Sequence, residues 1–312
     1  MLMRFFSLIF IILLTSSCNK HHAVIVPPVA KKALQQRQLP AFNQVVAEGN
    51  INVSLHTGYA HPQLILHGNT LDLMQVQTEV SNNSLLIHVG KGYPRYGAIT
   101  AEVRGRYLNA FTYRGAGTIT GNNLRSSLLD LTIDNPGRTT LGGQIFLRKL
   151  AVSGGGYTQI SGVYGQYLQL SIEDKSRVQL SGTMNITKLD LDGNAWLAMY
   201  WVKSNALIIR AKDNAFIQLA GVVGKLDVEL WDSAHFNGRY LRADRAFVKT
   251  HNKAIADVAA VKRQHTLATD ASDIYFYNIP TMKTDFMAYN GSVLDMRDLN
   301  VAFIQEYDRY NK

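Results

Sequence analysis

The apolar residues of this chain recur in short alternating runs that return about every 19 residues. One Gly, Asp or Asn marks each unit, and neighbouring marks are 18 to 20 residues apart. These turn marks are Gly117, Gly137, Gly156, Asp174, Gly193, Asp213, Asp232, Asn252, Asp270 and Asn290. All three residue types favour turns, because they tolerate left-handed backbone or bond their own backbone. The pattern therefore predicts a series of similar units, each closed by one turn.

The positions around the turn marks repeat as well. Alternate residues before a mark are apolar, as in Leu168, Leu170 and Ile172. A small residue recurs two positions after the mark: Ser176, Ala195, Ala215, Ala234, Ala254, Ser272 and Ser292. Period-two alternation means that one face of a strand is buried, and short units enclose a core only by stacking. We predict an all-β fold, a right-handed parallel β-helix (solenoid) of about ten coils over residues 108–296, since parallel crossovers are right-handed.

The region before the repeats has strands of a different kind. Residues 40–107 contain short apolar runs separated by Gly, Asn and Ser, which predict hairpins or an N-terminal β-sheet layer. An exposed solenoid end invites aggregation. We therefore expect this layer to cover one end of the stack and the charged residues 297–312 to form a C-terminal cap at the other.

The first residues read as an export signal. Residues 1–17 hold one positive charge at Arg4, an apolar run over residues 5–14 and small residues before Cys18, the only cysteine. This resembles a bacterial lipobox, with Thr15 where Leu is usual, and implies a signal peptide followed by palmitate-type lipid on Cys18. Acyl chains would hold the protein to the membrane. In the lipoprotein pattern Asn19 favours the outer membrane, facing the periplasm or the cell surface; the alternative is a plain secretory signal with an incidental cysteine.

Residues 18–39 are predicted to be a tether between the lipid and the folded part. They contain Val26-Pro27-Pro28 and no acidic residue. The chain carries a net charge of +9, and more than half of it lies in Arg4 and the four cations of this segment. A basic tether is weakly attracted to anionic headgroups, although a solvated linker has the same composition. No nucleic-acid-binding motif is present, and we expect no nucleic acid partner.

The start of the repetitive part resembles a known family. The segment Phe42 to Leu55, the strand end at Gly68-Asn69, the strand at 85–87 and the turns at 115–117 and 153–156 are similar to the head GIN domain. That domain is found in proteins that carry the name auto-transporter adhesin, and it has no established function. The resemblance covers about residues 40–220 and departs later, where Asp and Asn replace Gly in the turns. It implies a β-helical fold, an envelope location and no established enzymatic activity.

Catalytic chemistry is weakly represented. The chain has no Gly-x-Ser-x-Gly, His-Glu-x-x-His or phosphate-loop motif, and we expect no enzyme activity, no cofactor and no metal. The turn marks Asp213 and Asp232 would lie one coil apart, so their carboxylates could bind Ca²⁺ or act as an acid–base pair. The alternative is turn chemistry, because Asn and Gly occupy the same position in other units.

Aromatic residues offer a second candidate site. Trp196, Tyr200 and Trp201 share one predicted unit, and Trp231 lies at the end of the next one. Their rings could stack on sugars, although packing at the edge of the core is the alternative. We predict a non-catalytic, adhesin-like binding or structural module, with a membrane through the lipid anchor, a polysaccharide or another envelope protein as partner. A β-helical polysaccharide lyase or hydrolase and an envelope assembly subunit are the alternatives.

Overall fold

The computed structural model describes residues 31–277 and 283–296. The chain divides into two units, residues 1–31 and 32–312, and the second unit is called the body below. The predicted signal peptide, Cys18 and the C-terminal cap at 297–312 lie outside the described residues. The first elements of the body are β1 (Lys32–Gln38), β2 (Gln44–Glu48), β3 (Asn52–His56), β4 (Gln63–Asn69), α2 (Thr70–Leu73), β5 (Val76–Ser81), β6 (Ser84–Val89), β7 (Thr100–Arg104) and β8 (Ala110–Arg114).

Long strands dominate the rest of the body. They are β9 (Ile119–Asp134), β10 (Arg138–Ser153), β11 (Tyr157–Ile172), β12 (Arg177–Leu191), β13 (Trp196–Ala211), β14 (Phe216–Leu230), β15 (His235–Thr250) and β16 (Ile255–Thr269). Three shorter strands follow: β17 (Asp273–Phe276), β18 (Lys283–Tyr289) and β19 (Ser292–Asp295). None of the described helices has the length and apolarity that crossing a membrane requires.

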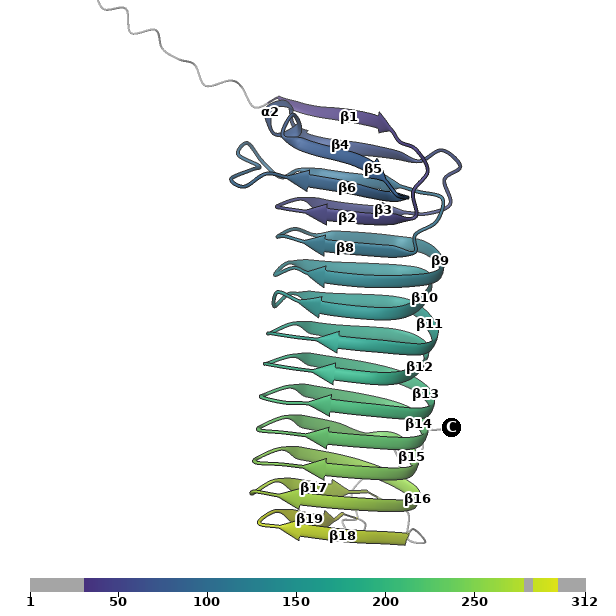
Figure 1. Cartoon of the computed structure of the whole chain (residues 1–312), viewed down its shortest axis with the longest axis vertical. Coiled ribbons are helices and arrows are strands. Elements are labelled where there is room, and N and C mark those ends of the chain that lie inside the picture. The colour runs from purple at the N-terminus through teal and green to yellow at the C-terminus, as the bar shows by residue number, and fades with distance from the viewer. Residues whose placement is uncertain (1–30, 278–282, 297–312) are drawn as a thin grey trace, which may run out of the picture. The chain divides into compact units, whose positions relative to one another are not determined.

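Each long strand is one coil of a solenoid, and each pairs in parallel with the strand of the next coil (Figure 1). The predicted parallel β-helix is therefore confirmed. The solenoid has about nine turns, where the repeat had predicted about ten. The count differs because ten turn marks enclose only nine intervals.

Every coil has four parts, which β13 illustrates. Residues 196–200 form face 1, residues 201–206 form a bend rim, and residues 207–211 form face 2 before the turn at Asp213. Trp201 and Asp213 have left-handed backbone, with φ of 67° and 58°, at the two changes of direction. In Figure 1 the bend rims lie at the right-hand edge of the stack and the turns at the left. The two faces and the two edges are thus distinct surfaces.

The core consists of columns of side chains that follow the strand register. One column contains Val178, Leu197, Ile217, Phe236, Ala256 and Ile274, all with 0 % exposure. A second contains the small residues after the turns, and those from Ser176 to Ser272 are also fully buried. Burying one Leu, Ile or Phe side chain stabilises the fold by roughly 1.5–3 kcal/mol. The predicted apolar and small columns are confirmed.

The backbone conformation at the turn marks explains which residue types occupy them. From Asp174 to Asn290, all seven marks have φ between 56° and 72°. Asp and Asn adopt this left-handed region more readily than other residues with a side chain. Gly137 has a different reason, because a Cβ atom there would lie 2.4 Å from the carbonyl oxygen of Gly117 in the previous coil.

The N-terminal region joins the same stack in an order that the sequence did not predict. Strand β2 pairs in parallel with both β6 and β8, and β3 pairs with both β7 and β9. The coil that comes first in the sequence therefore lies inside the stack. Beyond it, β4 pairs antiparallel with β1 and β7, and β5 with β6. Antiparallel strands thus end the parallel ladder at this end.

The predicted tether is shorter than expected. Residues 32–38, which the sequence placed in it, form β1 against β4. The Arg37 guanidinium donates hydrogen bonds to the Val76 carbonyl at 3.0 Å and to Thr78 Oγ1 at 2.7 Å. The strand is largely exposed, so it has no apolar alternation that could have revealed it.

Candidate functional site

A shallow depression of about 280 Å³ lies on face 2 beside the turns. It crosses four coils, and its polar and aromatic lining consists of Ser171, Glu173, Asp190, Asp192, Arg210, Lys212 and Trp231. Its volume lies just under the roughly 300–1,000 Å³ that is typical of small-molecule pockets. The depression can therefore hold about one small ring, with the rest of a ligand outside it.

Parallel pairing places these side chains in rows. Asp190, Arg210 and Glu229 are in register in three successive coils, and each points outward from face 2. One position before the turn marks, Asp192, Lys212 and Trp231 occupy the next row. The depression lies where these two rows run side by side.

Ion pairs fix most of the charged groups. Lys188 Nζ lies 2.6 Å from Asp190 Oδ2, and Lys212 Nζ lies 2.8 Å from Asp192 Oδ2. The Arg210 guanidinium contacts Asp227 Oδ1 at 3.1 Å and Glu229 Oε2 at 3.2 Å. Exposed pairs of this kind contribute only about 0–1 kcal/mol each to stability. Their main effect here is to hold donors and acceptors in fixed positions around the depression.

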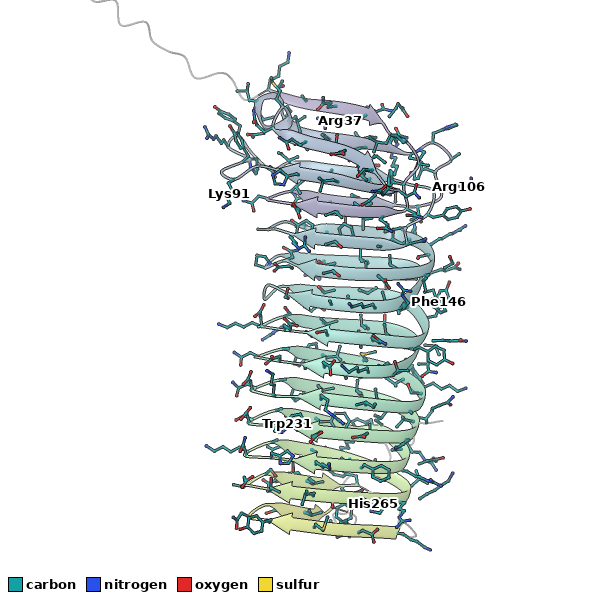
Figure 2. All side chains as sticks on the ribbon, in the orientation of Figure 1. Arg37, Lys91, Arg106, Phe146, Trp231 and His265 are labelled. Atoms are coloured by element: carbon teal, nitrogen blue, oxygen red, sulfur yellow. The ribbon has the colours of Figure 1, made fainter. Side chains whose placement is uncertain are left out.

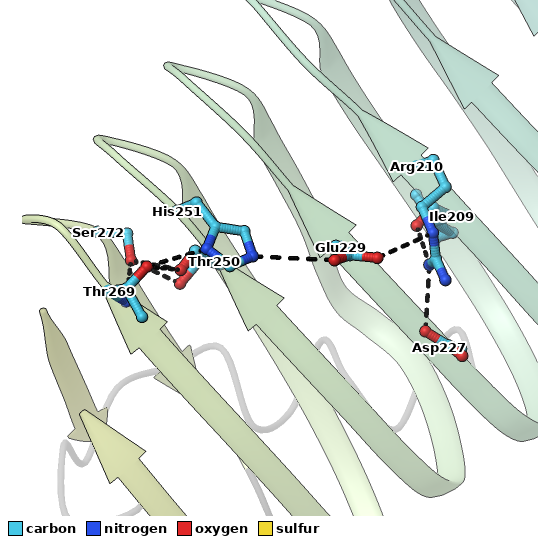
Figure 3. A network of polar contacts seen from close by, with 8 residues as sticks. All are labelled: Ile209, Arg210, Asp227, Glu229, Thr250, His251, Thr269 and Ser272. Carbon is cyan, nitrogen blue, oxygen red and sulfur yellow. Dashed lines mark hydrogen bonds and ion pairs between the residues drawn. The ribbon is translucent and has the colours of Figure 1, made fainter. Parts of the chain in front are cut away.

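The polar contacts continue from Arg210 across the following coils (Figure 3). Glu229 Oε1 lies 3.9 Å from His251 Nε2, and His251 Nδ1 lies 2.9 Å from Thr269 Oγ1. The chain of contacts ends at Thr250 and Ser272, whose hydroxyl oxygens are 2.8 Å apart. This network connects the depression to the coils on its C-terminal side.

Trp231 is the aromatic member of the site. Its ring stacks on the His251 imidazole, with centroids 5.8 Å apart and an angle of 18° between the planes. His251 Nδ1 is itself within hydrogen-bond distance of Thr269 Oγ1. Trp231 therefore borders the depression with its orientation already set, and it remains partly exposed to a ligand.

The Asp192–Lys212 pair keeps both groups charged. The hydrogen bond from Lys212 holds the pKa of the Asp192 carboxyl below its usual range. The same bond raises the pKa of the Lys212 ammonium. A depressed carboxyl pKa means that the pair persists at neutral pH and is lost as the pH falls through the folded-state pKa.

The predicted aromatic residues do not form one site. Trp196 lies on face 1, in register with Arg177 and Phe216, and Tyr200 and Trp201 lie where face 1 meets the bend rim. Trp231 lies beside the turns, at the opposite edge from Phe146 of the bend rim (Figure 2). Of the four, only Trp231 lines the depression. Their positions in the same or the next unit did not bring them together, because successive parts of a coil face different directions.

The predicted aspartates belong to the turns. Asp213 Oδ2 accepts a hydrogen bond from the Gly193 N–H of the previous coil at 3.2 Å, and Asp232 Oδ1 accepts one from the Asn252 side chain at 2.9 Å. Both residues have left-handed backbone. Within the residues that the structure describes, no group of three or more His, Cys, Asp or Glu side chains is arranged to hold a metal ion. These observations favour the turn interpretation of the two carboxylates.

Sequence reasoning missed Asp190, Asp192, Arg210 and Lys212. Their signal is positional: Asp190 and Arg210 lie three residues before their turn marks, and Asp192 and Lys212 lie one residue before. Equal offsets become neighbouring positions once the coils stack. The register of the outward residues, as well as that of the buried ones, identifies the site.

Comparison with protein families shows which family the chain belongs to. The family described as "Putative auto-transporter adhesin, head GIN domain" matches residues 41–204, which is more than half of the 312 residues. The chain belongs to the head GIN domain family. The matched part of the head GIN domain includes Asp190 and Asp192, whereas Arg210, Lys212 and Trp231 lie beyond it. No curated protein matches the sequence.

Solved structures that resemble this head GIN domain protein are distant in sequence. One described as a putative adhesin from Parabacteroides merdae is 11 % identical, with a TM-score of 0.48, and the match covers 86 % of this chain and 97 % of that one. One described as a putative adhesin from Parabacteroides distasonis is 13 % identical, with a TM-score of 0.48 and 86 % and 98 % coverage. Another from the same species, described as a putative lipid binding protein, is 11 % identical, with a TM-score of 0.43 and 86 % and 97 % coverage.

Proposed function

We propose that this protein is an exported, lipid-anchored envelope protein whose solenoid is a non-catalytic, adhesin-like binding module. In this proposal the depression on face 2 binds one ring of a glycan. The observation that carries the proposal is the position of Trp231, a partly exposed indole that His251 backs and that borders a small polar depression. Membership of the head GIN domain family supports an adhesin-like role.

The chemistry of the depression suits a sugar. The C–H face of a pyranose is apolar and packs on an aromatic ring, while its hydroxyl groups both donate and accept hydrogen bonds. Glu173, Asp190 and Asp192 supply acceptors, and Arg210 and Lys212 supply donors. Because the charges are mixed and largely paired, a neutral sugar is favoured over a strongly charged ligand.

The arrangement of the carboxylates argues for binding without catalysis. A glycosidase needs one carboxyl group with a raised pKa as the acid and a second carboxylate opposite it. Here Asp190 and Asp192 each lie against a lysine, and the pKa of Asp192 is lowered. Asp213 and Asp232 make their hydrogen bonds within the turns and do not line the depression.

The lipid anchor is the part of the proposal that rests on sequence. An apolar run of about ten residues is too short to span a bilayer, and small residues lead from it to the single Cys18. Cells given a radioactive fatty acid should label the protein, and Cys18→Ser should abolish the label. Labelling of the Cys18→Ser variant, or an unlabelled native protein in the membrane fraction, would contradict lipid attachment at this residue.

A glycan array tests the binding site. The full chain, purified in a neutral detergent, should bind a subset of neutral glycans, and Trp231→Ala should weaken that binding about tenfold or more, as a buried aromatic anchor does. Trp201→Ala is the matched control, because Trp201 is exposed on the bend rim and should leave binding unchanged. Thermal unfolding of both variants checks that the fold is intact. Equal loss in both variants, or the release of new reducing ends from a glycan, would overturn the proposal.

A further inference from the structure

A ladder of four cations runs along the bend rim of the C-terminal coils. Lys225 of β14 pairs in register with Arg245 of β15, Arg245 with Arg263 of β16, and Arg263 with Lys283 of β18. Each residue lies seven positions before its turn mark, so the repeat itself places them in one column. All four side chains are exposed. We call these four residues the cation ladder.

The surroundings of the ladder are basic as well. The bend rims of β13 to β16 cover residues 201–206, 220–225, 239–245 and 259–263. They hold seven cations and only one acidic residue, Asp244. Asp244 is already paired with Lys262, at 2.7 Å from its Nζ atom. The positive charge of the body is therefore concentrated on this edge, away from the mixed charges of the depression.

Only part of the ladder is neutralised within the protein. Arg263 lies 3.2 Å from Asp285, and Lys225 lies over the Phe247 ring at 5.3 Å from its centroid. Within residues 31–277 and 283–296, no carboxylate forms an ion pair with Arg245 or Lys283, nor with Lys203 or Arg242 beside them. Like charges directly opposite each other on neighbouring strands are destabilising. A bound polyanion would neutralise the repulsion between these exposed cations.

The distance between successive cations of the ladder indicates how the anionic groups of a partner should be spaced. Neighbouring strands lie about 4.8 Å apart, so the ladder offers one cation per step of that length along a straight line. This step is close to the length of one sugar unit in an extended glycan. A linear polysaccharide with one acidic group per sugar can therefore place successive anions against successive coils.

Other polyanions match the ladder less well. Each strand of B-DNA carries one phosphate per about 3.4 Å of helix axis, and the strands wind around that axis, so successive phosphates do not stay aligned with a straight row of cations. An anionic bilayer would approach the neighbouring outward column of face 2 as well as the ladder, and there Asp227 and Asp285 would repel its headgroups. A narrow linear chain meets the ladder alone.

We propose that the cation ladder, with Lys203, Arg242 and Lys262 beside it, binds a linear acidic polysaccharide along the bend rim. This surface lies at the edge of the coil opposite the turns, so the proposal is independent of glycan binding at Trp231. Carboxylate, sulfate and phosphate groups offer the same charge chemistry, and the probes below separate them.

Salt-dependent binding of the full chain, purified in a neutral detergent, tests the proposal. Polygalacturonate and heparin are the carboxylate and sulfate probes, a teichoic acid of the poly(glycerol phosphate) type is the phosphate probe, and neutral dextran is the blank. The ladder variant is Arg245→Gln with Arg263→Gln. The control variant is Lys175→Gln with Lys253→Gln, which removes the same charge from exposed lysines in the turns.

The native protein should bind at least one acidic glycan with an affinity that falls as salt rises. The ladder variant should lose about 2 from the slope of log K against log salt, because each cation–anion contact contributes about 1. The control variant and Trp231→Ala should bind as the native protein does. Without ligand, the ladder variant should unfold at the same or a higher temperature, because repulsion is relieved.

Several results would overturn the proposal. Equal losses in the ladder and control variants would mean that net charge alone drives binding. Ladder-dependent binding to duplex DNA, or to phosphatidylcholine vesicles containing phosphatidylglycerol, without binding to any acidic glycan would assign the edge to another partner. The lipid anchor is the same in every variant, so differences between variants in the vesicle assay isolate the ladder.

Discussion

Replacing Tyr113 by Phe tests how tightly the N-terminal coil is held inside the stack. Tyr113 lies in β8, is 0 % exposed, and donates a hydrogen bond from its hydroxyl to the Ile51 carbonyl at 2.9 Å. Ile51 lies between β2 and β3, and these two strands form the coil that is inserted between later segments of the chain. At pH 8, loss of this buried hydrogen bond should lower the free energy of unfolding by about 1–2 kcal/mol.

The same hydroxyl gives this prediction a pH signature. Burial raises the pKa of Tyr113 to about 12, from an ordinary value of 10.0. A raised folded-state pKa contributes stability that is fully present below pH 10 and is lost as the pH rises through 12, because the unfolded chain ionises first. At pH 11 the loss amounts to about 1.4 kcal/mol, since one pKa unit corresponds to about 1.4 kcal/mol.

Phenylalanine cannot ionise, so the Tyr113→Phe variant lacks this loss. Urea unfolding of both proteins, followed by circular dichroism at pH 8 and pH 11, gives the difference in their unfolding free energies. All other titrating groups are common to both proteins and cancel in that difference. The advantage of the native protein should shrink by about 1.4 kcal/mol between the two pH values. Phe111→Leu, in the same strand, is the control, and its effect should not change with pH; an equally constant difference for Tyr113→Phe would refute the reasoning.

Three further predictions concern the columns of the solenoid, each measured by chemical or thermal unfolding. Phe236→Ala should cost about 3–5 kcal/mol, because Phe236 is fully buried between Ile217 and Ala256; a cost below 1 kcal/mol would mean that its column is not packed. Ala234→Leu should cost about 1–3 kcal/mol or more through overpacking of the small column, whereas an unchanged midpoint would contradict a tight corner. Asp213→Asn should be nearly neutral and Asp213→Val should cost about 1–2 kcal/mol, because a β-branched residue resists φ near 58°; equal effects would show that the charge, and not the backbone, selects Asp.

The periodic part of the fold was predictable because its information is local. Within each unit, the alternation of apolar residues predicts which side chains are buried, as in Leu207, Ile209 and Ala211. A residue that tolerates left-handed backbone predicts where the turn falls. Nine successive intervals of 18 to 20 residues then leave stacking as the way to bury all of these faces together. The ten marks also explain why the predicted coil count was one too high.

The N-terminal region was less predictable because its pairings are non-local. Strand β2 lies between β6 and β8, and both of these strands come tens of residues later in the sequence. Strand β1 has almost no apolar alternation, and only its contacts with β4 and the hydrogen bonds of Arg37 identify it. No local pattern encodes such an insertion.

The candidate site divides in the same way. Trp231 was selected from the sequence, but its partners His251, Arg210 and Lys212 were not, because they lie about 20 residues away in neighbouring coils. Trp196 and Trp201 were grouped with it only because they are aromatic residues of the preceding unit. One repeat passes through two faces and two edges, so residues that are close in sequence can lie on different surfaces. Residues in register in neighbouring coils lie side by side.

By itself, the sequence determined that the chain is a stack of β-coils, which residues turn inward, and where each turn falls. These properties depend on interactions within one repeat: alternation, small corners and left-handed turn residues. Only the tertiary structure decided which outward residues become neighbours, and so produced the depression beside Trp231 and the cation ladder on the bend rim. The physical reason is that strand pairing sets those neighbours about 4.8 Å apart between coils, through backbone hydrogen bonds that carry no side-chain signature.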